Sequence, residues 1–167
     1  MTFAGIVGPA TWQKLYEVYY DIKGSTPPPP PPPPPPPTGD PIMKEIQSTL
    51  NQRYGTNLTV DGIFGRLTKA ALVIGLQSEL NRQFGRNLAV DGVWGPATRA
   101  ATVAVRQGAA GNITYIIQAA LYARGYNLVP DGVFGPATEA AVRAFQRDQG
   151  ITTDGVAGPE TQDRLFR

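Results

Sequence analysis

The sequence predicts an all-α fold: two tandem three-helix bundles with long inter-helix loops, preceded by a polyproline II linker and a partial third module. Two observations predict it. A fourteen-residue phrase with an Asp-Gly pair at its centre occurs three times, beginning at Gly55, Gly85 and Gly125. Between the copies, apolar residues recur at the three- and four-residue spacing of amphipathic helices. Such repetition means that one supersecondary unit is reused, and fold and function should both be read from that unit.

Residues 1–40 contain a module fragment and a linker. A short echo of the repeated phrase at residues 4–11 precedes a few apolar residues, so we expect residues 1–22 to be the C-terminal fragment of a module. Eleven consecutive prolines, residues 27–37, must form a polyproline II rod inside a linker at residues 23–40. We interpret this rod as a spacer, and the alternative is a docking site for an SH3- or profilin-like partner.

The first complete module is expected at residues 41–107. Its first helix is predicted over 41–54, because Asp40 is a good N-cap and a proline fits the first helical position. The second helix, over 66–84, carries leucines every four residues on one face. The third, over 96–106, is rich in alanine.

The second complete module is expected at residues 108–167, after a break at a Gly-Ala-Ala-Gly sequence. Asn112 is expected to cap a helix whose apolar stripe runs from 113 to 121. Two further helices are predicted over 136–147 and 159–166, because each begins with a Gly-Pro pair.

Each repeated loop is interpreted as a helix stop, a pinned turn and a helix start. The first glycine of the phrase suits the left-handed conformation that ends a helix, and Asp-Gly is a turn pair. The aspartates are therefore predicted to form turns rather than to act as catalytic carboxylates, and the aromatic residues that follow are predicted to contact the core. Calcium loops are excluded because oxygen ligands do not follow the aspartates. These structural loop residues are Asp61, Gly62, Phe64, Asp91, Gly92, Trp94, Asp131, Gly132, Phe134, Asp154 and Gly155.

Composition narrows the possible chemistry. The chain has no cysteine and no histidine, so it cannot by itself build a disulfide, a zinc hydrolase site or a Ser-His-Asp triad. We therefore expect a chain that is not an enzyme and that holds neither a metal nor a cofactor. The net charge is +2, with an excess of basic residues in 41–107 that permits an anionic partner. No apolar run is long enough to span a membrane, and no secretory signal is visible at the N-terminus.

The second module closely resembles the peptidoglycan-binding-like module of bacterial and phage cell-wall hydrolases. The residues that carry this resemblance are Ile117, Gln118, Leu121, Gly125, Tyr126, Asp131, Gly132, Phe134, Gly135, Thr138, Ala141, Val142, Phe145, Gln146, Gly150, Asp154, Gly155, Gly158, Thr161 and Leu165. Residues 41–107 look like a divergent member with a longer middle helix, in which Leu76-Gln77 stands where Phe-Gln is expected. Residues 4–20 resemble the last third of such a module.

The resemblance implies a non-catalytic module that binds bacterial peptidoglycan, both glycan and stem peptide. Such a module anchors or targets an attached hydrolase domain to murein, in an extracellular or cell-wall setting that includes spores and phage lysins. Two alternatives stay open: a helical scaffold whose proline rod docks a partner, and weak nucleic-acid binding by the basic middle module. Nucleic acid is the less favoured partner because no helix clusters Arg and Asn.

A peptidoglycan binder needs exposed aromatic rings for sugar or peptide faces, amides for hydrogen bonds, and arginines for carboxylates. Two of the arginines in the second module share a helix face at a spacing of four residues. The ligand-binding candidates are Tyr126, Arg143, Gln146, Arg147, Tyr54, Arg53, Arg82 and Arg86. For each of them, the alternative is surface or semi-buried packing.

Overall fold

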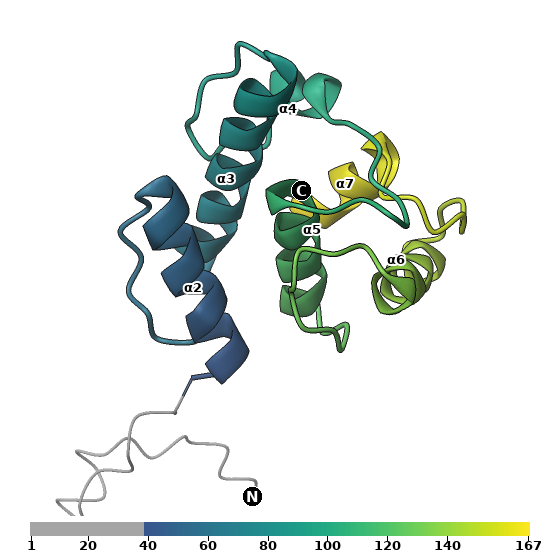
Figure 1. Ribbon diagram of the computed structural model, residues 1–167, viewed down its shortest axis with the longest axis horizontal. Coiled ribbons are helices and arrows are strands. Elements are labelled where there is room, and N and C mark those ends of the chain that lie inside the picture. Colours follow the sequence, from purple (N-terminus) through teal and green to yellow (C-terminus); the bar gives the residue numbers. More distant parts are fainter. Residues whose placement is uncertain (1–38) are drawn as a thin grey trace, which may run out of the picture. The chain divides into compact units, whose positions relative to one another are not determined.

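The structure is a computed structural model, and it describes residues 39–167. Within this range the fold is all-α, as predicted, with isolated bridges in place of strands (Figure 1). The helices are α2 (Pro41–Tyr54), α3 (Arg66–Phe84), α4 (Pro96–Ala101), α5 (Asn112–Ala123), α6 (Pro136–Asp148) and α7 (Pro159–Phe166). The predictions for residues 1–22 and for the proline rod at 27–37 lie outside the described residues.

The local signals at the helix ends act mostly as predicted. The Oδ1 atom of Asp40 accepts a hydrogen bond from the backbone N–H of Met43 at 2.8 Å, so Asp40 caps α2. Gly55 and Gly85 end α2 and α3 with φ of 63° and 62°, in the left-handed region that glycine favours. The cap predicted at Asn112 is wrong, because α5 begins at Asn112 itself. The Asn112 side chain instead forms hydrogen bonds with Arg53 of α2 and Glu79 of α3.

Helix α3 lies at the centre of the fold and packs against α2 on one side and α5 on another (Figure 1). The predicted leucine face is fully buried, and so are residues on other faces of α3. At Gly75, an added Cβ would lie 2.9 Å from Cε2 of Tyr54 and 3.1 Å from Cδ1 of Ile116, so this close approach of three helices depends on glycine. The buried apolar residues of both modules form one continuous core.

Helix α4 ends at Ala101 rather than at the predicted Arg106, because the chain that follows pairs with loops of the second module. Val105 and Ala157 exchange backbone hydrogen bonds of 3.2 and 2.8 Å. Phe134 donates its N–H to the Ala109 carbonyl at 2.8 Å and accepts from Gly108 N–H at 3.0 Å. The stretch from 105 to 111 therefore pairs through its backbone with loops of the second module.

The aromatic residues of the repeated loops have different environments. Phe134 is 1 % exposed, as predicted for a core contact, and Trp94 packs on Phe166 with ring centroids 5.2 Å apart. Phe64 is more exposed, at 36 %, and lines a cavity together with the buried core residues Leu72, Leu165 and Phe166. Phe134 lies in the loop that pairs with Ala109, whereas Phe64 lies at a groove between the modules.

Candidate functional site

A buried glutamine fastens each of the four loops, an arrangement that we call the glutamine clamp. In the first loop, Gln47 Nε2 donates to Asp61 Oδ1 at 2.9 Å and to the Ile63 carbonyl at 3.1 Å. Gln47 Oε1 accepts from the Gly62 N–H at 2.8 Å, and Thr68 Oγ1 lies 3.2 Å from Nε2. The other clamps are Gln77 with Asp91 and Thr98, Gln118 with Asp131 and Thr138, and Gln146 with Asp154 and Thr161.

The loop aspartates accept hydrogen bonds inside their own loops. A hydrogen bond from the backbone N–H two residues on, followed by one from the clamp glutamine, lowers the pKa of Asp91, Asp131 and Asp154. For Asp61 the glutamine is the larger of these two causes of the lowered pKa. These carboxylates are thus held ionised as turn formers, which is the role that the repeated Asp-Gly pairs indicated.

Gln146, a predicted ligand contact, is one of the clamp glutamines. It is 1 % exposed, and both its amide nitrogen and its amide oxygen are hydrogen-bonded within the loop. The amide is therefore not presented at the surface. Sequence reasoning missed this role, although a signal was present: Gln47 and Gln77 stand 14 residues before an Asp-Gly pair, Gln118 stands 13 before one and Gln146 stands 8 before one.

Three candidates of the first module gather around one buried carboxylate, Glu79, which is 1 % exposed. Tyr54 donates its hydroxyl to Glu79 at 3.0 Å, and Arg82 lies 3.2 Å away. Asn112 of α5 donates to the same carboxylate at 2.9 Å and accepts from Arg53 at 2.8 Å. These side chains therefore join the two modules, and they are engaged with one another.

The pKa of Glu79 reflects this arrangement. Burial raises the pKa, but hydrogen bonds from Gln83, Asn112 and Tyr54 outweigh it, and the net direction is below the ordinary value. Burial and the neighbouring Glu79 charge raise the pKa of Tyr54 in turn. The pair therefore stays as a neutral phenol and an ionised carboxylate at neutral pH.

The candidates of the second module are not brought together in one site. Arg143 binds Glu139 at 2.9 Å and the Thr153 carbonyl at 2.9 Å, so it supports the last loop. Arg147 is exposed, as is Arg86 of the first module. Tyr126 donates to Asp148 at 2.7 Å, and it alone among the eight candidates lines a described cavity.

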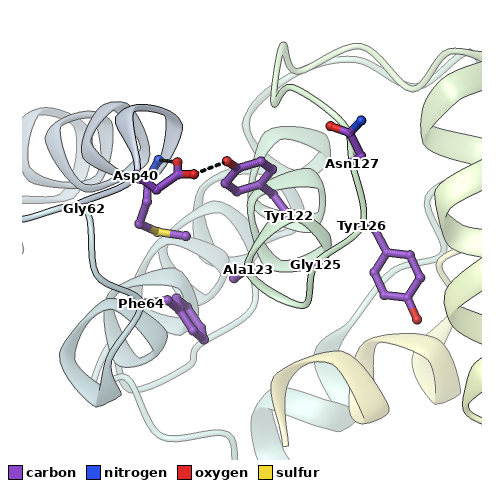
Figure 2. A pocket seen from close by; sticks show the side chains of 9 residues that line it. Asp40, Gly62, Phe64, Tyr122, Ala123, Gly125, Tyr126 and Asn127 are labelled. Atoms are coloured by element: carbon purple, nitrogen blue, oxygen red, sulfur yellow. Dashed lines mark hydrogen bonds between the residues drawn. The ribbon is translucent and has the colours of Figure 1, made fainter. Parts of the chain in front are cut away.

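A cavity of about 380 Å³ opens between the start of α2, the first loop and the end of α5 (Figure 2). Across it, Tyr122 of the second module donates to Oδ2 of Asp40 of the first at 2.6 Å. Figure 2 shows Tyr122 turned toward Asp40, whereas the Tyr126 ring points away from that pair. Phe64 and Asn127 also line this cavity and supply an exposed aromatic face and an amide.

Two more cavities follow the first, and each shares lining residues with the one before it. One of about 190 Å³ shares Phe64 with it and is walled by α3, α5 and α7. A third, of about 420 Å³, shares Lys69 and Phe166 with the second. We call this row of three cavities the inter-module groove. Its first end is polar and aromatic, Phe64 separates the first two cavities, and its last cavity is lined by Trp94 and by several cationic side chains.

The described residues carry two further observations. Residues 39–167 contain no group of three His, Cys, Asp or Glu residues that would hold a metal ion. No helix among them has both the length and the apolar character needed to cross a membrane. Independently of these two observations, the three cavities present hydrogen-bond donors, acceptors and aromatic faces.

The chain matches the family described as "Putative peptidoglycan binding domain" twice, at residues 39–101 and 111–165. A solved structure with a similar sequence is the peptidoglycan-binding protein of Clostridioides difficile in complex with glutamine hydroxamate. It is 39% identical over 40% of this chain, with a TM-score of 0.39, and the match spans 42% of that protein. Among curated proteins, none matches this chain.

Proposed function

The chain belongs to this family of peptidoglycan-binding domains, in tandem copies, and from this premise we propose that residues 39–167 hold bacterial peptidoglycan in the inter-module groove. The modules of the family bind without catalysing a reaction, and binding to peptidoglycan implies a cell-wall setting. The proposed role is to anchor or target an attached cell-wall hydrolase to murein.

The main observation that supports this proposal is the exposed ring of Phe64. Phe64 is 36 % exposed, whereas the equivalent Phe134 is buried, so its ring offers an apolar face to a cavity that polar side chains also line. N-acetylated sugars have one apolar face that can stack on such a ring, and their amide and hydroxyl groups need polar partners nearby. Asn127 and Asp40 supply these partners in the same cavity. Tyr126 contributes at the edge of this site, where its hydroxyl bonds to Asp148.

The test is co-sedimentation of the full chain with insoluble sacculi freed of teichoic acid. We expect the wild type to sediment at micromolar protein and Phe64→Ala to lose about two- to tenfold in affinity, because an aromatic contact contributes on the order of 0.5–1.5 kcal/mol. Phe84→Ala is the matched control, since Phe84 is 46 % exposed and lines none of the three cavities.

Two outcomes would refute the proposal. One is a wild-type chain that stays in the supernatant. The other is equal affinity of the Phe64 and Phe84 variants, which would move the binding surface away from the groove. Repeating the measurement at several salt concentrations separates murein binding from nucleic-acid-like electrostatic binding, which falls steeply with salt.

A further inference from the structure

The last cavity of the inter-module groove has an excess of positive charge. Arg66, Lys69 and Arg99 line it together with Arg167. The acidic side chain facing them from the helices packed here is Asp163 of α7. It already receives Arg99 Nε at 2.8 Å and Arg167 at 2.7 Å.

Of the remaining hydrogen-bond donors around this cavity, two have acceptors among the described residues and one does not. The indole N–H of Trp94 also donates to Asp163, at 2.9 Å. Lys69 donates to the main-chain oxygen of Arg167 at 2.7 Å. Arg66 makes no side-chain hydrogen bond or ion pair among residues 39–167 and is exposed at the rim. Within residues 39–167, the cavity therefore presents one guanidinium without a side-chain partner beside two others that share a single carboxylate.

The surroundings restrict the anion that would fit. Trp94 and Phe166 give the cavity an aromatic wall, with ring centroids 5.2 Å apart, and the shared residue Phe166 leads to the apolar cavity at Phe64. A ligand there must join a negative group to small apolar groups. A guanidinium binds a planar carboxylate through two parallel hydrogen bonds, and it also stacks on aromatic rings.

We propose that this cavity is a subsite for the carboxylate of a murein stem peptide, with Arg66 as its principal partner. The inference rests on the proposed function, because it places the peptide at one end of the groove and the sugar at the other. The first module would then bind the peptide, and Phe64 would lie between the sugar and the peptide of the bound ligand.

The experiment uses soluble muropeptides with free stem-peptide carboxylates, and the same muropeptides after amidation, titrated into the full chain by calorimetry. We expect the free carboxylate form to bind wild type about tenfold more tightly, since a hydrogen bond to a charged group is worth about 1.5–3 kcal/mol. Arg66→Gln should bind the two forms equally. Arg66 is the first residue of α3, where a positive charge opposes the helix dipole, so its removal does not threaten folding.

Arg86→Gln is the matched control, because it removes an exposed arginine of the same module that lines none of the three cavities. It should keep the full preference for the carboxylate. Equal binding of the two muropeptides by wild type overturns the inference, and so does an equal loss in both variants, which would indicate general electrostatics. Displacement by inorganic phosphate beyond that by chloride at the same ionic strength would overturn it as well, in favour of a phosphate site. Failure to bind sacculi at all refutes the proposed function instead.

Discussion

Replacing Gln146 by methionine separates a structural role from a ligand contact. Methionine keeps the length and volume of the side chain but removes its amide. In the structure, Gln146 Oε1 accepts from the buried Gly155 N–H at 2.9 Å, and Nε2 donates to Asp154, Val156 and Thr161 at 2.8, 2.9 and 2.9 Å. The substitution removes the amide that these four groups share as a hydrogen-bond partner.

The magnitude follows from these contacts. Leaving the Gly155 N–H unpaired costs about 1–3 kcal/mol, and losing the Nε2 bonds, in which two hydrogens serve three acceptors, costs about 2 kcal/mol. We expect the free energy of unfolding to fall by about 3–5 kcal/mol, a large part of the 5–15 kcal/mol typical of a domain. For a chain of this size, the melting temperature should fall by roughly 6–20 °C.

Urea unfolding followed by circular dichroism at 222 nm measures the effect. Gln149→Met is the control, because it makes the same chemical change at an exposed position three residues further on, where we expect a change within about 0.5 kcal/mol. A loss below about 1 kcal/mol for Gln146→Met would refute the clamp argument. Weakened murein binding with unchanged stability would instead restore Gln146 as a ligand contact.

Two further substitutions test the loops and the module junction. Gly155→Ala should lower the free energy of unfolding by about 1–3 kcal/mol, because Gly155 has φ of +75° and the new Cβ would lie 2.8 Å from Glu139 Cγ. Gly158→Ala is the control in the same urea assay. It should cost less, because Gly158 has a negative φ and open space around its Cβ position. Glu79→Gln should destabilise the chain at pH 7, and the gap to wild type should close as pH falls. The pKa of Glu79 is lowered in the folded state, so its ionised form stabilises the fold above the unfolded pKa of about 4.3, and that contribution is lost as pH falls through the folded pKa. Urea midpoints of both proteins from pH 7 to 3 measure this, and a gap that is constant with pH would contradict it.

The sequence predicted those parts of the fold that depend on local signals. Proline at the first helical position and glycine at the helix ends act within one turn of chain, so the starts of α2, α4, α6 and α7 agree with expectation. The end of α4 was missed because its competitor is distant in sequence. The residues after Ala101 form backbone hydrogen bonds with Ala157 and Phe134. The sequence between 96 and 106 contains no local signal that predicts these partners.

The candidate site was harder to predict because the candidate residues were chosen by chemical type. Tyr54, Arg53 and Arg82 have the side chains that a murein binder needs, but Glu79 and Asn112 engage them at the module junction. Glu79 was not singled out, since a lone glutamate in a helix is usually solvated. Tyr54 of α2 and Asn112 of α5 both contact it, and these contacts come from residues distant in sequence.

The repeat itself was the strongest signal, but it did not indicate how deeply each copy of a repeated residue is buried. Phe64 and Phe134 occupy the same slot of the same phrase, which suggests the same role. The chain from 105 to 111 pairs with the loop of Phe134, whereas the loop of Phe64 borders cavities walled by α5 and α7. Because those walls belong to the second module, the groove exists only in the tandem pair. The same repeated residue can therefore be buried in one copy and partly exposed in the other, and its neighbours in space decide which.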